Sequence, residues 1–236
     1  MIECTEDRIL GDDIVLFQPK HGYRVAVDPF LLASRVEITG NQSILDVGCG
    51  VGTISLILKK LDSSQEISAV DIDGEMIELC KKNSEINALP LNIYHAGISK
   101  EFLKSSLFDC VITNPPFYQK DFNRISAQKM YANFETVSLL QWIRFCLQHL
   151  RNKGKFYMIH LPERLPEILS AFKSQVGNIE ITPILSKAGR IAKRIIISAE
   201  KGRKAALKIM PLVIVHEENG DYTETVQHIL ATGREG

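Results

Sequence analysis

Hydrophobic and polar positions along the chain change repeatedly between two spacings, and these changes predict the order of its strands and helices. Short, nearly continuous apolar runs rich in Val and Ile predict strands at residues 43–47, 66–71, 91–95, 107–114, 155–161, 179–185, 194–200 and 208–217. Segments in which apolar residues recur every three or four positions predict helices at residues 51–61, 74–87, 135–154, 162–175 and 222–231. Gly154 is expected to end the third of these helices, because glycine readily terminates helices.

The first 40 residues have a different pattern. They predict two short strands on either side of a turn at Gly11–Asp13, followed by a loop and a helix that begins near residue 28. Asp28 is expected to cap that helix, with Pro29 at its first position. We therefore expect an N-terminal extension over residues 1–40 and one larger domain over residues 41–236.

Strands that alternate with helices predict an α/β fold, in which a mainly parallel sheet carries helices on both faces. In such sheets a ligand binds beyond the carboxyl ends of the strands, at the point where the strand order reverses. Residues that carry chemistry are therefore expected directly after the first, second and fourth strands of the larger domain.

The composition is that of an ordinary globular protein and excludes several classes. Apolar residues make up 45% of the 236 residues and charged residues 24%. No apolar run approaches the ~20 residues that span a bilayer, and the acidic N-terminus lacks the features of a signal peptide. We therefore expect a cytoplasmic protein that does not bind membranes, with a monomer favoured. The five cysteines lie far apart, so neither a metal site nor a disulfide framework is expected.

The formal net charge is zero, but the charges are unevenly distributed. Between Lys187 and Lys208 the chain has eight basic residues and one acidic residue, Glu200. A basic region on an otherwise acidic protein can hold a phosphate backbone. A solvated surface is the alternative interpretation of the same charges.

A glycine-rich turn follows the first strand of the larger domain. The segment reads LDVGCGVGTISL, with Gly48, Gly50 and Gly52 between a strand and a helix. Thr53 stands where the dinucleotide fingerprint GxGxxG has Gly or Ala, which weakens an NAD or FAD interpretation. Asp46 precedes the turn, and a carboxylate there suits the ammonium group of S-adenosylmethionine (SAM) better than a pyrophosphate. A tight turn without a ligand is the alternative.

The second strand ends at Asp71, 21 residues after Gly50, where a carboxylate can accept hydrogen bonds from both ribose hydroxyls. Ile72 is then expected to lie against the adenine ring of the cofactor. This segment resembles the first motifs of class I SAM-dependent methyltransferases. The resemblance implies a Rossmann-like sheet of seven strands, the last antiparallel, with SAM as the cofactor. That family usually carries an acid where this chain has Ile98, so a backbone group near Gly97 or Ile98 is expected to read the adenine.

The fourth strand leads into Asn114-Pro115-Pro116-Phe117. An exocyclic adenine amine is a poor nucleophile, because its lone pair is delocalised into the ring. The Asn114 side-chain oxygen and the Pro115 carbonyl can each accept one N–H and so direct the lone pair toward the methyl group. Two prolines fix the backbone that holds these acceptors, and Phe117 can stack on the base. Asn114 is also expected to border the cofactor.

The tetrapeptide resembles the (N/D/S)PP(Y/F/W) signature of amino-group methyltransferases, which act on adenine N6, cytosine N4 or a protein glutamine amide. A rigid turn without chemistry is the alternative. The segments FQPKHGYRVAVDPFLLA and RIAKRIIISAEKG resemble those of the bacterial tRNA1(Val) adenine-37 N6-methyltransferase family, and the likeness covers nearly the whole chain. The resemblance implies tRNA as the partner and an adenine next to the anticodon of a valine tRNA as the target.

Basic residues near the expected active-site edge are candidate tRNA contacts. In a sheet of this family the antiparallel strand begins at that edge, so the first half of the basic region is expected nearer the site. A plain surface charge is the alternative for each residue. The candidates are Arg24, Lys120, Lys187, Arg190, Lys193 and Arg194.

Two other functions remain open. A protein glutamine methyltransferase acting on a release factor would use the same Asn-Pro-Pro-aromatic chemistry. That class usually carries a helical N-terminal domain and a Tyr at the fourth position, where this chain has Phe117. A non-catalytic RNA-binding module would keep SAM only as a structural ligand, and the intact tetrapeptide argues against it.

Overall fold

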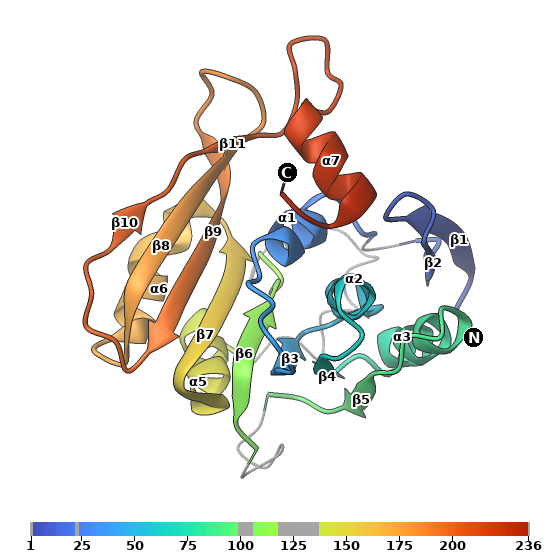
Figure 1. Ribbon diagram of the computed structural model, residues 1–236, viewed down its shortest axis with the longest axis horizontal. Coiled ribbons are helices and arrows are strands. Elements are labelled where there is room, and N and C mark those ends of the chain that lie inside the picture. The colour runs from blue at the N-terminus through green and yellow to red at the C-terminus, as the bar shows by residue number, and fades with distance from the viewer. Residues whose placement is uncertain (1, 22–23, 99–105, 118–136, 236) are drawn as a thin grey trace.

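The computed structural model describes residues 2–21, 24–98, 106–117 and 137–235. Among them a nine-stranded sheet forms the centre of the molecule, and a two-stranded hairpin lies apart from it (Figure 1). The strand order of the large sheet is β10-β8-β9-β7-β6-β3-β4-β5, and β11 also pairs with β8. These strands are β3 (Ser43–Val47), β4 (Glu66–Asp71), β5 (Asn92–His95), β6 (Phe108–Thr113), β7 (Leu150–His160), β8 (Val176–Leu185), β9 (Ala192–Lys201), β10 (Lys208–Ile209) and β11 (Val213–Ile214).

The predicted α/β fold and its antiparallel strand are confirmed. β5, β4, β3, β6 and β7 pair in parallel along the sheet, whereas β9 runs antiparallel to both β7 and β8. The two-residue strands β10 and β11 come in addition to the seven strands that the resemblance implies, and both run parallel to β8. The carboxyl ends of β3, β4, β6 and β7 therefore share one edge of the sheet with the beginning of β9.

Helices cover both faces of the sheet. The apolar side chains of α5 and α6 pack with Leu45 and Val111 on one face, and those of α1, α2 and α7 pack with Ile44 and Ile112 on the other. Neighbouring residues of one strand thus enter different cores, which explains the nearly continuous apolar runs. The helices are α1 (Asp28–Ser34), α2 (Thr53–Leu61), α3 (Gly74–Ile86), α5 (Leu139–Gln148), the 3-10 helix η1 (Pro162–Arg164), α6 (Leu165–Phe172) and α7 (Glu224–Thr232).

The hairpin of β1 (Cys4–Ile9) and β2 (Ile14–Pro19) is joined to α3 by two asparagine side chains one helical turn apart. Asn87 accepts a hydrogen bond from the Val15 N–H (2.8 Å) and donates one to the Val15 carbonyl (2.7 Å). Asn83 makes the same pair with Phe17 (2.7 and 2.9 Å) and also donates to the Val51 carbonyl (3.0 Å). The buried Asn83 amide therefore links the hairpin to the turn that follows β3.

Replacing Asn83 by alanine is expected to lower the free energy of unfolding by about 2–4 kcal/mol, because three hydrogen bonds are lost and buried backbone groups lose their partners. Urea unfolding followed by far-UV circular dichroism measures this loss. Asn87→Ala is the matched control, with an expected loss of about 1–2 kcal/mol, because Asn87 is less buried and does not reach Val51. Equal losses in the two variants would show that the link to Val51 adds no stability.

The expectation that a helix ends at Gly154 is wrong. Residues 135–136 lie outside the described residues, α5 ends at Gln148, and β7 already begins at Leu150. The pairing of β6 with β7 shifts register after Phe108, and Gly154 lies next to this irregularity. A Cβ on Gly154 would be 2.9 Å from the Asp109 carbonyl oxygen, so the glycine permits close packing of two strands and does not end a helix.

Two further expectations need correction. Asp28 does not cap α1: the cap position is Val27, which has helical backbone angles and makes no side-chain cap. Asp28 pairs instead with Arg194, across 166 positions of sequence. The strand expected over 208–217 is divided into β10 and β11 on either side of Pro211, which has no N–H for the ladder.

Candidate active site

The turn after β3 comprises residues 48–52, and its backbone has the shape of a cradle for a ligand. Gly48, Gly50 and Gly52 all have left-handed backbone angles, with φ of 73°, 54° and 88°. A Cβ on Gly48 would lie 2.9 Å from the indole ring of Trp142, so this glycine allows α5 to pack against the turn. A Cβ on Gly50 would meet no atom within 4 Å, so the turn presents open backbone there. Glycines are needed here because they adopt left-handed backbone angles readily and let a ligand come close to the backbone.

Asp71, at the end of β4, holds the turn in place. Its carboxylate accepts hydrogen bonds from the Gly50 N–H (2.8 Å) and the Asp73 N–H (2.9 Å). Burial raises the pKa of Asp71, and the two backbone hydrogen bonds oppose that rise. Asp73 in turn caps α3, accepting hydrogen bonds from the Glu75 and Met76 N–H groups. The ends of β3 and β4 and the start of α3 therefore form one connected unit.

Asp46 lies beneath the turn and is fully buried. One oxygen accepts a hydrogen bond from the Ser55 hydroxyl (2.7 Å), and burial raises the pKa of this carboxyl to about 7. The other oxygen, Oδ1, is buried without a hydrogen-bond partner within the described parts of the chain, and so is the hydroxyl of Thr53 at the start of α2. Unpaired buried polar groups cost about 1–3 kcal/mol each. A cationic N–H donor bound here would relieve that cost, which fits the ammonium group of SAM.

The segments that follow β4 and β5 provide apolar surroundings next to the cradle. A Cβ on Gly97 would be 3.2 Å from the Ile72 side chain, and Ile98 packs against the core cluster that contains α5. The His95 ring lies 3.0 Å from the Ile72 carbonyl oxygen through Nε2 and would contact a Cβ on Gly74. The surroundings of Ile72 thus suit a flat aromatic group, and Ile98 supplies no carboxylate to it.

The tetrapeptide Asn114–Phe117 begins where β6 ends, beside the cradle. The Thr113 hydroxyl donates to the Val47 carbonyl (2.8 Å) and accepts from the Trp142 indole N–H (2.9 Å). The first of these buried hydrogen bonds ties the end of β6 to the end of β3, and the second ties α5 to the end of β6. Pro115 is buried, whereas Asn114 is partly exposed and Pro116 is exposed. The cradle and the tetrapeptide therefore lie side by side on a fixed frame.

The Phe117 ring is held among side chains from distant segments. The Arg194 guanidinium carbon lies 4.3 Å from its centroid, and the His160 ring contacts it edge to face at 5.4 Å. His160 Nδ1 accepts the Leu161 N–H (2.8 Å), and burial, with Arg164 and Arg194 nearby, lowers the pKa of His160 to about 4. His160 is therefore neutral at physiological pH.

Several of these partners were not identified as site residues from the sequence. Direct contacts to the glycine turn or the tetrapeptide come from Thr113, Trp142 and His160. Asp28 contacts the tetrapeptide only indirectly, because it binds Arg194, which lies on Phe117. The single Trp of the chain and a His at the end of an apolar strand are weak signals, because both also occur in ordinary cores.

The candidate RNA contacts differ in their surroundings. Arg190 and Lys193 are exposed and make no ion pair with any described carboxylate, whereas the Lys187 ammonium donates to the Glu218 carbonyl (2.7 Å). Arg194 is partly buried against Asp28. Lys120 lies outside the described residues.

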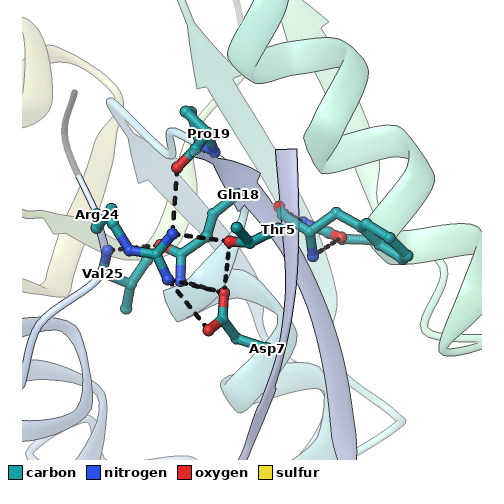
Figure 2. Close-up of polar contacts among 8 residues, drawn as sticks. Thr5, Asp7, Gln18, Pro19, Arg24 and Val25 are labelled. Atoms are coloured by element: carbon teal, nitrogen blue, oxygen red, sulfur yellow. Dashed lines mark hydrogen bonds and ion pairs between the residues drawn. The ribbon is translucent and has the colours of Figure 1, made fainter. Parts of the chain in front are cut away.

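Arg24 has a dense set of partners in the N-terminal hairpin, as Figure 2 shows. Its guanidinium contacts both carboxylate oxygens of Asp7 (3.1 and 3.0 Å) and donates to the Thr5 hydroxyl (2.7 Å). Gln18 donates to the same carboxylate and accepts the Val25 N–H (2.8 Å). These bonds hold the segment that leads from the hairpin to α1, so they give Arg24 a structural task within this chain.

The described residues contain no group of three or more His, Cys, Asp or Glu side chains that would hold a metal ion. None of the helices in the described parts of the chain combines the length and the apolar character that a membrane span requires.

Comparison with known proteins identifies relatives that match most of the chain. A family model for the methyltransferase small domain matches residues 27–182. A tRNA1(Val) (adenine(37)-N6)-methyltransferase of Shewanella baltica strain OS195 is 27% identical over 220 residues, which cover 89% of this chain and 91% of the relative.

Solved structures of methyltransferases have the same fold. A predicted O-methyltransferase of Agrobacterium tumefaciens is 26% identical, with a TM-score of 0.70 over 88% of this chain and 97% of that one. The Thermus thermophilus 16S rRNA N2 G1207 methyltransferase, solved with AdoMet and guanosine, is 22% identical, with a TM-score of 0.59 over 84% of this chain and 50% of that one.

Proposed function

The chain belongs to the methyltransferase small domain family and uses SAM as its cofactor, and we propose that it methylates the N6 amine of an adenine in tRNA. The observation that carries this proposal is the tetrapeptide Asn114–Phe117, fixed beside the glycine cradle at the carboxyl edge of the sheet. Relatives along almost the whole chain are named for adenine 37 of tRNA1(Val). We therefore propose the adenine next to the anticodon of a valine tRNA as the target.

The cofactor side of the site is proposed to use three features. Asp46 and the open Gly50 backbone would receive the amino-acid part of SAM, and Asp71 would accept hydrogen bonds from the ribose hydroxyls through its remaining lone pairs. Ile72, Gly97 and Ile98 would surround the adenine. When bound, SAM supplies a methyl group on a positively charged sulfur, which is an activated leaving group. The chain then has mainly to hold the acceptor nitrogen in line with that methyl group.

The acceptor side is proposed to act through hydrogen-bond acceptors and stacking. The Asn114 side-chain oxygen and the Pro115 carbonyl would each accept one N–H of the adenine amine, which frees the nitrogen lone pair to attack. Phe117 would stack on the base, and Pro116 would limit the backbone paths open to the loop. The nitrogen forms the new bond to the methyl carbon, the carbon–sulfur bond breaks, and one amine proton leaves to solvent. Neutral His160 contacts Phe117 and is not required as a base.

The RNA side of the proposal rests on charge and position. Arg190 lies in the loop before β9 and Lys193 near the start of β9, both exposed at the same edge of the sheet as the tetrapeptide, and Lys187 lies in the same loop as Arg190. We propose these residues, together with Lys120, as contacts to tRNA phosphates. An adenine in an anticodon loop is already partly unstacked, so placing it on Phe117 costs less than flipping a base out of a duplex.

The test is transfer from labelled SAM to total bacterial tRNA, followed by nucleoside mass spectrometry. N6-methyladenosine in the tRNA is expected, and a valine tRNA transcript should accept the label while the same transcript with guanosine at the target position should not. A purified release factor is the parallel acceptor. Label in that protein and none in tRNA would replace the proposed function with glutamine methylation.

The affinity for SAM is expected to rise with pH between about 6 and 7.5. Asp46 has a pKa of about 7 in the folded protein, so part of the population is protonated at neutral pH. A bound ammonium favours the carboxylate, so binding releases a proton below pH 7, and affinity should increase by up to about tenfold per pH unit there. Above about pH 7.5 the gain ends because Asp46 is already ionised, and above about pH 8 the affinity should fall, because an α-amino group loses its own proton at about 7.7–8.0.

Titration calorimetry at several pH values measures this dependence. Asp46→Asn keeps the shape of the side chain but cannot ionise, so its SAM affinity should be weaker and nearly independent of pH below 7. An unchanged slope in the Asn variant would assign the proton to another group.

A further inference from the structure

The sequence predicts Arg194 as a phosphate contact, like Arg190 and Lys193, but its surroundings differ from theirs. Its Nε donates to an Asp28 carboxylate oxygen (3.0 Å), and its Nη1 donates to the Lys193 carbonyl (2.9 Å). The side chains of Arg194 and Asp28 are 26% and 15% exposed, so this ion pair is partly shielded from water. A cation neutralised in this way has little charge left to offer to a phosphate.

The same guanidinium covers the Phe117 ring. Its central carbon lies 4.3 Å from the ring centroid, within the range of a cation–π contact. Phe117 follows two prolines at the end of a strand, and its ring direction is set by rotation about side-chain bonds that the prolines do not control. Arg194 on the ring and His160 at 5.4 Å are the described aromatic and cationic neighbours that limit this rotation.

We infer that Arg194 is a positioning residue for methyl transfer: anchored by Asp28, its guanidinium holds the Phe117 ring in the orientation that receives the target adenine. The inference rests on the proposed function, in which Phe117 stacks on the base. Asp28 is the first residue of α1 and Arg194 lies near the start of β9, so the N-terminal extension contributes to the orientation of the acceptor base.

The two roles of Arg194 predict different kinetics. A phosphate contact contributes to tRNA binding, and its loss raises KM and reduces the salt dependence of binding. A positioning residue affects the reacting geometry, and a misplacement of about 1 Å can cost roughly 100-fold in rate. Loss of Arg194 should therefore lower kcat and leave KM for tRNA nearly unchanged.

The experiment measures kcat and KM for valine tRNA at saturating SAM, over a series of salt concentrations. Arg194→Met is expected to lower kcat by about 10- to 100-fold, to change KM by less than about 3-fold, and to keep the wild-type salt slope. Arg203→Met is the matched control, because Arg203 also pairs with a carboxylate, Glu200 (2.6 Å), but lies beyond the opposite end of β9. It should retain wild-type kcat, KM and salt slope.

Further variants separate the two roles of Arg194. Asp28→Asn removes the anchor charge without changing the shape, and its kcat should fall in the same direction as that of Arg194→Met. The double variant should be no slower than Arg194→Met alone, because both changes break one arrangement. Arg190→Met should show the opposite pattern, a raised KM and a shallower salt slope. SAM affinity and thermal melting identify any variant that is misfolded, and Arg194→Lys then takes the place of Arg194→Met.

The outcomes separate the inference from the proposed function. Unchanged kcat in Arg194→Met, or a raised KM with a shallower salt slope, would overturn the inference while wild-type transfer to tRNA still supports the function. Absence of wild-type transfer to any tRNA would overturn the proposed function, and the inference with it.

Discussion

Alanine in place of Asn114 is expected to lower kcat for methyl transfer to tRNA by about 10²–10³-fold, with SAM affinity within a few-fold of wild type. The side-chain oxygen is one of two proposed acceptors for the amine N–H groups, and removal of one preorganised hydrogen-bond group from a reacting centre typically costs this much. Asn114 lies beyond the end of β6, whereas the cofactor turn is held by Asp71 and Trp142. The substitution should therefore impair positioning of the acceptor amine and leave SAM binding nearly unchanged.

Single-turnover transfer measures the chemical step in this variant, and calorimetry measures SAM binding. Asn219→Ala serves as the matched control, because Asn219 lies in an exposed loop before α7 and, within the described residues, its side chain hydrogen-bonds only to Asp221. It should retain the wild-type rate. Transfer by Asn114→Ala at the wild-type rate would exclude the proposed mechanism.

Replacing Asp71 by alanine is expected to weaken SAM binding by about 100-fold. The variant loses a carboxylate proposed to bind the ribose hydroxyls, and hydrogen bonds to a charged group contribute about 1.5–3 kcal/mol each. The variant also loses the hydrogen bond from the Gly50 N–H, which helps to fix the turn proposed to bind the cofactor. At saturating SAM, kcat should recover most of its wild-type value, because Asp71 does not contact the acceptor.

Asp73→Ala is the control that distinguishes a role of Asp71 in SAM binding from a role in local stability alone. Asp73 is two residues away and caps α3 through the Glu75 and Met76 N–H groups. Its loss should lower the free energy of unfolding by about 0.5–2 kcal/mol and change SAM affinity little. If the two variants lost SAM affinity equally, Asp71 would act only as part of the local framework.

The fold could be predicted from the sequence to the extent that it depends on local patterns. Apolar runs and helical spacing identified the main strands of the sheet, because strands buried on both faces carry an unmistakable apolar signal. Errors arose where distant contacts decide the local structure. The segment before Gly154 has helical spacing, but pairing with β6 draws residues from Leu150 onward into β7. The local sequence predicts Asp28 as a helix cap, but the fold places Arg194 of β9 beside it, and the two side chains form an ion pair.

The candidate site shows the same division. Asp46, the three glycines and Asn114–Phe117 are contiguous motifs whose chemistry can be read directly from their order. Trp142 and His160 lie on other elements, and only the three-dimensional arrangement shows that they hold the motifs together. Arg194 was recognised by its charge, but its partner, and so the role inferred for it, depends on a contact across 166 positions. Charge alone does not distinguish a ligand contact from an internal support.

Trp142 is the single tryptophan of the chain, and its indole lies between the cofactor turn and the residue that precedes the tetrapeptide. Indole emission responds to nearby polar groups and to stacking, and here all of it originates at one known position. The molecule thus contains its own optical probe. Fluorescence titrations can follow how cofactor and tRNA occupy the two neighbouring loops, in what order and how fast, without a label or a mutation.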